Sequence, residues 1–281
     1  MTKCFVDMAE IFNDSVFLEP NDPTSFVTNE FNMDKAMVYV KKLNEEQKDV
    51  HVTMTAVIAH AVGWGLYKMR RDVGHLRFGT FKADKSFGVT VLVDKDGGAD
   101  LVPVTIWDAH KMTIFDVAKA LNAHVQSAKK GKDEKHNKAT ASADFLPTFI
   151  IQVLSFCVTY IGVVVGIPMK AFGIRKESFG HVVITNVGTL GYNSAYPPIC
   201  PAMHSMALIC TGKIEKRPIV VDDKVAIANM MTLVATGDHR YGDAAIFIPF
   251  FKSVTGYIDD PANYDEKNFR ETVHYTEAKA K

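Results

Sequence analysis

The sequence predicts an α/β domain in which helices pack on a mixed β-sheet. Strand-like segments recur along the chain, helical segments separate some of them, and the two kinds do not alternate in strict βαβ order. Apolar residues make up 47% of the 281 residues and charged residues 23%, which is typical of a globular chain with a full core. We therefore expect a single domain over residues 1–281.

The N-terminal part of the chain predicts a strand followed by two helices. Thr24 to Phe31 alternates and is rich in β-forming residues, which indicates a strand. Asp34 can cap a helix whose apolar residues recur at helical spacing as far as Leu43. A second, more deeply buried helix is expected from Val52 to Met69.

Two strands and a third helix follow. Phe87 to Val93 and Leu101 to Ile106 are apolar runs, and the turn residues Asp94 to Gly98 separate them. Thr113 can cap a helix whose apolar residues recur every four positions.

The C-terminal half is richer in strand signals. Short β-branched or apolar runs predict strands over residues 181–186, 205–211, 218–221 and 225–236. Apolar residues occupy both the odd positions of the last strand, such as Val225 and Ile227, and its even positions, so we expect both of its faces to be covered. Helical spacing returns from Gly242 to Ile258.

Charge and cysteine content exclude several classes of protein. Lysine plus arginine equals aspartate plus glutamate, 32 each, so the chain lacks the surplus of cations that nucleic-acid binding needs. The four cysteines form no CxxC pair, and no signal peptide precedes residue 19, so we expect a cytoplasmic protein. Cys200 and His204 stand four apart, but two such residues without a third ligand do not predict a metal site.

Residues 145–169 form an uncharged, apolar segment that is long enough to cross a bilayer as a helix. Gly162 and Gly166 within it would allow close helix packing. A single crossing would place the two halves of the chain on opposite sides of a membrane, which is incompatible with a shared sheet. The open alternatives are a buried helix, a re-entrant hairpin, a contact between subunits, and a helix on a membrane surface that would make the protein peripheral to a membrane.

The segment Asp238 to Ala244, with the letters DHRYGDA, carries the strongest chemical signal. It lies between the last strand and the last helix, a junction that can hold a side chain rigidly and leave it accessible. His239 can act as a base near neutral pH because an unperturbed imidazole has a pKa of about 6.5. Asp243, four residues later, can order the local turn.

The order of the segments around this motif is as informative as the motif itself. The segments are HVVITNVGTLG (181–191), ALICTGKI (207–214), RPIVVD (217–222), DHRYGDA (238–244) and YIDDP (257–261). In this order they resemble the catalytic domain of the dihydrolipoyl acyltransferases of 2-oxoacid dehydrogenase complexes, which shares its fold with chloramphenicol acetyltransferase. The resemblance extends from near Thr24 to Pro261, which gives a core of about 24–261 and leaves 145–169 as an apolar insertion.

The resemblance implies a fold and a mechanism. The fold is a two-layer α/β sandwich, assembled as a homotrimer or a multiple of trimers with active sites between neighbours. His239 is the implied base, Thr185 of the adjacent chain the implied oxyanion donor, and Asp243 the residue that holds the loop, through an arginine that the sequence does not identify. The implied reaction moves an acyl group between a coenzyme A thioester and a thiol or hydroxyl acceptor, without a metal.

Some features depart from the family pattern. Ala244 replaces the final glycine of the motif, and Gly242 stands where the family has a branched residue. The resemblance includes no lipoyl domain, so we expect the acceptor to be a free molecule or a lipoyl group of another protein. The alternative is a catalytically inactive scaffold that assembles with a larger complex.

Two further groups of residues have a functional and a structural interpretation. Lys129, Lys130 and Lys132 suit either the phosphates of coenzyme A or a solvated loop, and the loop is the simpler interpretation. His60 lies on an apolar helix, which predicts a hydrogen-bonded core residue.

Overall fold

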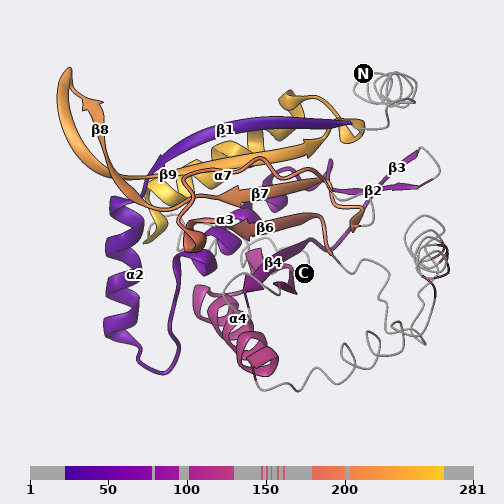
Figure 1. The fold of residues 1–281 in the computed structure, drawn as a ribbon, viewed down its shortest axis with the longest axis horizontal. Coiled ribbons are helices and arrows are strands. Elements are labelled where there is room, and N and C mark those ends of the chain that lie inside the picture. Colours follow the sequence, from indigo (N-terminus) through magenta and orange to yellow (C-terminus); the bar gives the residue numbers. More distant parts are fainter. Residues whose placement is uncertain are drawn as a thin grey trace, which may run out of the picture.

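The structure, a computed structural model, describes residues 23–77, 80–94, 101–129, 179–199 and 203–262, together with positions 147, 150, 153, 157 and 161. Within these residues a seven-stranded sheet forms the centre of the molecule, and a two-stranded hairpin lies at one end of it (Figure 1). The strands of the sheet are β1 (Thr24–Asn32), β4 (Gly88–Asp94), β5 (Leu101–Trp107), β6 (Val182–Asn186), β7 (Ala207–Thr211), β8 (Glu215–Val221) and β9 (Lys224–Asp238). The hairpin consists of β2 (Gly74–Arg77) and β3 (Thr80–Ala83).

The strand order confirms the predicted mixed sheet. The strands lie in the order β1-β9-β7-β6-β4-β5, and β8 pairs with the first half of β9. Strand β6 runs parallel to both of its neighbours, β4 and β7, whereas the other pairs are antiparallel. Strands from the two halves of the sequence therefore share one sheet.

The helices form the second layer. They are α2 (Asp34–Glu46), α3 (Met54–Lys68), α4 (Ile114–Lys129) and α7 (Ile248–Asp259), with the short 3-10 turns η1 (Ala109–Lys111), η4 (Gly188–Leu190), η6 (His239–Tyr241) and η7 (Ala244–Phe247). Helices α3 and α7 pack against each other behind the central strands (Figure 1). Trp64 on α3 and Val52, two residues before α3, are almost completely buried there.

The alternation of side chains in the central strands separates two apolar clusters. Ile184, Ile209 and Leu233 belong to the main core together with the helices. Val183, between such positions, belongs to a smaller cluster on the opposite face. The helix face is thus the thick core of the domain, and the opposite face carries a thinner apolar layer.

Local sequence signals explain the start of α4 and the turn between β8 and β9. Thr113 caps α4 as predicted, because its Oγ1 accepts from the backbone N–H of Asp116 at 3.2 Å and the Asp116 carboxylate accepts in return from the N–H of Thr113 at 3.1 Å. Asp222 and Asp223 form the turn between β8 and β9 with positive φ angles of 48° and 58°.

Two expectations need correction, and one element was not predicted. Asp34 does not cap α2; its Oδ1 instead accepts from the backbone and side chain of Asn229, which ties α2 to β9. The β2–β3 hairpin was not predicted from the sequence. The first half of β9 is not covered on both faces, since Val225 is 77% and Ile227 75% exposed.

The apolar segment 145–169 lies almost entirely outside the described residues, and so do Lys130, Lys132 and Cys200. None of the helices in the part of the chain that the structure describes has the length and apolar character needed to cross a bilayer.

Candidate functional site

The predicted motif forms a short loop at the end of β9. The strand ends at Asp238, and His239 to Tyr241 make a single 3-10 turn. The backbone N–H of His239 donates to the carbonyl of Pro23 at 2.8 Å, which joins the loop to the start of β1. A rigid strand therefore delivers His239 to one edge of the molecule.

An ion pair inside the motif anchors this loop. Asp238 is 2% exposed, and its carboxylate accepts from Nη2 of Arg240 at 2.7 Å and from the Arg240 backbone N–H at 3.0 Å. A buried carboxylate is tolerated only when it is paired in this way, so the pair restricts the loop to one arrangement. The sequence motif contains both residues, but the sequence alone did not assign this role to them.

His239 remains accessible beside Asp243. Its side chain is 35% exposed, and its Nε2 lies 3.8 Å from Oδ1 of Asp243. This distance is too long for a hydrogen bond but short enough for an ion pair with a protonated imidazole. The structure thus brings His239 and Asp243 together. The motif arginine, Arg240, pairs with Asp238.

Thr185 lies far from His239 within one chain. It pairs with Cys210 across β6 and β7, and Cys210 pairs with Val234 of β9. Asp238 is four residues further along β9, which corresponds to about 13 Å along the strand and about 10 Å across it. Contact between Thr185 and His239 therefore requires a second copy of the chain.

The glycine substitution in the motif has a local explanation. Gly242 has a φ of 141°, which few other residues adopt, and a Cβ there would lie 2.1 Å from Cδ1 of Ile246. Ala244 begins the 3-10 turn η7, a conformation that alanine adopts without strain. The loop thus keeps a required glycine, displaced by two positions from the family pattern.

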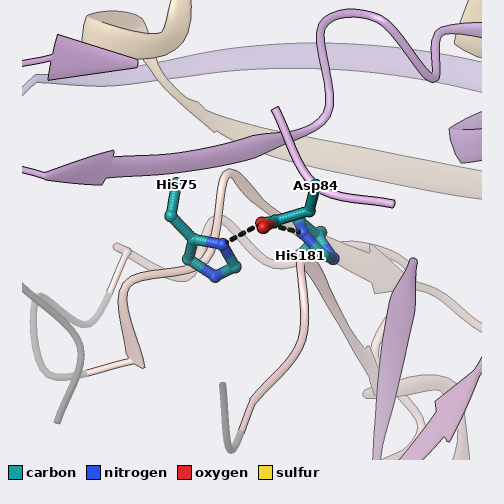
Figure 2. A group of neighbouring side chains, drawn as sticks. All are labelled: His75, Asp84 and His181. Carbon is teal, nitrogen blue, oxygen red and sulfur yellow. Dashed lines mark hydrogen bonds and ion pairs between the residues drawn. The ribbon is translucent and has the colours of Figure 1, made fainter. Parts of the chain in front are cut away.

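A second cluster, formed by His75, Asp84 and His181, lies near the motif loop. Figure 2 shows the Asp84 carboxylate between the two imidazoles; Oδ2 is 2.5 Å from Nδ1 of His75 and 3.0 Å from Nε2 of His181. Both histidines are at least 97% buried. The hairpin that carries His75 also reaches the motif loop, where the rings of Phe81 and Tyr241 make an edge-to-face contact at 6.4 Å.

The hydrogen bonds of His181 argue against a metal at this cluster, although its three potential ligand atoms lie within 4.8 Å of one another. Nδ1 of His181 accepts from the backbone N–H of Gly88 at 3.0 Å. A neutral imidazole whose Nδ1 accepts must carry its proton on Nε2, the atom that a metal would need. The cluster instead fits a carboxylate that accepts from two imidazoles, which links the hairpin to the start of β6.

Burial and neighbouring charges shift the pKa values around this region. Burial opposes ionisation of Asp84, but the hydrogen bonds from His181 and His75 outweigh it and hold the pKa of Asp84 well below its usual range. Burial raises the pKa of the Tyr241 hydroxyl, and the nearby Asp238 acts in the same direction. Burial lowers the pKa of His204, and Arg240 adds to the effect.

His60 is confirmed as a core residue. It is fully buried, and its Nδ1 is 2.9 Å from the hydroxyl of Tyr257 on α7. Burial lowers its pKa to about 4, so the ring is neutral at physiological pH. The hydrogen bond joins α3 to α7 and explains a histidine in an apolar helix.

The sequence matches one protein family over most of its length. The family is described as "2-oxoacid dehydrogenases acyltransferase (catalytic domain)", and the match covers residues 18–142 and 175–264. The apolar segment 145–169 lies in the gap between these two matched ranges.

Curated relatives are similar over shorter stretches. The chain is 28% identical over 89 residues to the lipoamide acyltransferase component of the branched-chain alpha-keto acid dehydrogenase complex of Pseudomonas putida. These 89 residues are 31% of this chain and 21% of that protein. It is 33% identical over 89 residues to a probable dihydrolipoyllysine-residue succinyltransferase component of the 2-oxoglutarate dehydrogenase complex of Schizosaccharomyces pombe, which is 32% of this chain and 19% of that protein. The matches thus span about a fifth of the length of these relatives.

Solved structures with the same fold cover nearly the whole chain. The dihydrolipoamide acetyltransferase of Azotobacter vinelandii superposes with a TM-score of 0.63 at 14% identity, over 92% of this chain and 89% of that chain. A probable dihydrolipoamide acetyltransferase of Listeria monocytogenes gives 0.62 at 15% identity, over 92% and 91%. The predicted α/β fold is confirmed, and the chain belongs to the family of 2-oxoacid dehydrogenase acyltransferase catalytic domains.

Proposed function

We propose that this chain is a coenzyme A-dependent acyltransferase with His239 as its general base. The observation that supports this most directly is the accessible imidazole of His239, held at the end of β9 by the ion pair between the buried Asp238 and Arg240. Family membership adds to it, because the relatives are named as acyltransferases.

The proposed reaction begins with proton transfer. The thiol of the acceptor has a pKa of about 8.5, so a neutral imidazole within hydrogen-bond reach takes its proton. The thiolate sulfur then forms a bond to the thioester carbonyl carbon, and the carbonyl oxygen becomes an oxyanion. Collapse of this intermediate breaks the original carbon–sulfur bond, and the leaving thiolate recovers the proton from His239. Asp243, 3.8 Å from the ring, favours the transient imidazolium.

In the proposed reaction, the hydroxyl of Thr185 of an adjacent chain donates a hydrogen bond to the oxyanion. The strand register separates Thr185 from His239 within one chain, so the complete site needs two chains. The hairpin of β8 and β9 extends beyond the body of the sheet (Figure 1), and its exposed Val220, Val225 and Ile227 form an apolar surface of the kind that marks subunit contacts. We therefore propose a homotrimer or a multiple of trimers.

A thiol-release assay with acetyl-coenzyme A and a free dithiol acceptor tests the base. His239→Ala is expected to lower kcat/KM by about a hundredfold to ten-thousandfold, because the proton of the acceptor then lacks a base. His51→Ala, at an exposed histidine away from the motif, is the matched control and is expected to retain parental activity. Absence of activity in the parent would support the catalytically inactive scaffold instead, and activity that survives in His239→Ala would contradict His239 as the base.

Mixing two inactive variants tests the site between chains. Thr185→Val alone is expected to lower kcat by about a hundredfold to a thousandfold through loss of one oxyanion donor, and Thr185→Ser is expected to restore most of it. Co-expressed Thr185→Val and His239→Ala chains are expected to regain activity, because one mixed interface combines an intact His239 with an intact Thr185. A mixture no more active than its components would contradict the shared site.

A further inference from the structure

A cavity of about 290 Å³ lies between the helix face of the sheet and α7. Gly242 and Ala244, in the loop that carries His239, form part of its wall. The cavity therefore reaches the loop that carries His239, and it lies on the face of the sheet opposite to the small apolar cluster around Val183. The proposed mechanism does not use this space.

The floor of the cavity is a row of small residues across three strands. Ser25 of β1 pairs with Gly237 of β9, and Gly237 pairs with Ala207 of β7. Residues in register on neighbouring strands point to the same face, so three small residues in a row leave a trough across the sheet. Ala235, in the next row, keeps the trough wide.

The roof and ends of the cavity are apolar. Phe247, Phe250 and Phe251, from η7 and α7, cover the trough, and Leu66 and Met69 close it from α3. Lys252 is the charged residue of the lining and is itself exposed to solvent. A space of this composition favours hydrocarbon over a polar or charged group.

We propose that this cavity binds the aliphatic chain of an acyl group of about eight carbons. A methylene group occupies roughly the volume of a water molecule, about 30 Å³, so the space accommodates a chain of about this length. The inference rests on the proposed function, because the shared loop connects the cavity with His239. It assigns a medium-chain acyl thioester as the substrate class.

Binding of unreactive thioethers to the complete chain tests the cavity directly. S-octyl-coenzyme A and S-ethyl-coenzyme A differ by six methylenes, and each buried methylene strengthens binding by about fourfold. By isothermal titration calorimetry the octyl compound is expected to bind at least about a hundredfold more tightly. Equal affinity of the two compounds would overturn the cavity proposal and leave the proposed function standing.

Two variants locate the effect. Val27 lines the cavity on its β1 side, and Val27→Trp places a larger side chain there to fill the space. The ratio of the affinities for the octyl and ethyl compounds is then expected to fall toward one. Val38→Trp makes the same change at a 69% exposed position of α2 and is expected to preserve the ratio. Gly237→Ala is the milder variant, since its Cβ meets only Ser25 Oγ at 3.4 Å, and is expected to lower the ratio by about fourfold.

Octanoate separates this proposal from the proposed function. If neither thioether binds and the parent has no transferase activity, the proposed function has failed. Titration with octanoate then tests by itself whether the cavity binds an aliphatic chain. Octanoate binding that Val27→Trp abolishes and Val38→Trp retains supports an aliphatic-chain site. Absence of octanoate binding in that case overturns it.

Discussion

The two halves of β9 have the same apolar alternation but different surroundings. From Met230 to Asp238 the strand lies between β1 and β7, and Leu233 and Val234 are buried on opposite faces. From Lys224 to Asn229 the strand pairs with β8 and extends away from the body of the sheet, so that Val225 and Ile227 stay exposed. Periodicity therefore assigns side chains to faces of a strand, whereas burial depends on what the rest of the fold places against each face.

The largest expected effect comes from removing a side chain in the buried half. Leu233→Ala is expected to lower the free energy of unfolding by about 2–5 kcal/mol, because it leaves a cavity at a position that is 1% exposed. Ile227→Ala removes a similar volume in the exposed half and is expected to change the free energy of unfolding of the dissociated chain by less than about 0.5 kcal/mol. Urea unfolding of both variants measures the difference, and similar losses at the two positions would contradict the comparison.

An intermediate effect on stability is expected at the cluster of His75, Asp84 and His181. This cluster supports the β2–β3 hairpin, which lies near the buried end of β9. Asp84→Asn is expected to lower the free energy of unfolding by about 1–3 kcal/mol near pH 7, because it removes the charged acceptor of two buried imidazoles. Asp49→Asn, at an exposed aspartate, is the matched control and is expected to leave stability unchanged.

The cost of Asp84→Asn is also expected to depend on pH. The pKa of Asp84 is lowered in the folded chain, so its contribution is fully present above the unfolded pKa of about 3.9, begins to decrease below that value, and is lost only as the pH falls through the lower folded pKa. Urea unfolding at pH 7, 5 and 3 is expected to show the same difference between parent and variant at pH 7 and 5 and a smaller difference at pH 3. A constant difference down to pH 3 would argue against an ionised Asp84 as the cause.

The smallest effect on the stability of the single chain is expected from a charge in the exposed half. Ile227→Asp is expected to change the free energy of unfolding of the dissociated chain by less than about 0.5 kcal/mol and to reduce the mass of the assembly in sedimentation. Val38→Asp on α2 controls for an added surface charge and is expected to preserve the assembly. An unchanged mass for Ile227→Asp would remove the hairpin from the proposed subunit contact.

Much of the candidate site could be predicted because its residues are close in sequence. Asp238, His239, Arg240 and Asp243 form one loop, and a strand followed by a helix is visible in the periodicity on either side of it. The internal pairing of the loop was not predictable, because the sequence does not indicate which carboxylate is buried.

The cluster of His75, Asp84 and His181 could not be predicted in the same way. Almost a hundred positions separate Asp84 from His181, and the hairpin that holds His75 has only four residues in each strand. The one available signal was a histidine directly before an apolar strand, which does not identify its partner.

The family, the identity of most strands and helices, and the position of His239 at a strand end were predictable from the sequence, because these properties depend on local spacing and local order. Contacts between distant parts of the chain became visible only in the folded molecule: the trough formed by Ser25, Gly237 and Ala207, the carboxylate between two imidazoles, and the separation of Thr185 from His239. Strand register and helix packing create these contacts, and both depend on the free energy of the whole fold rather than on any single segment.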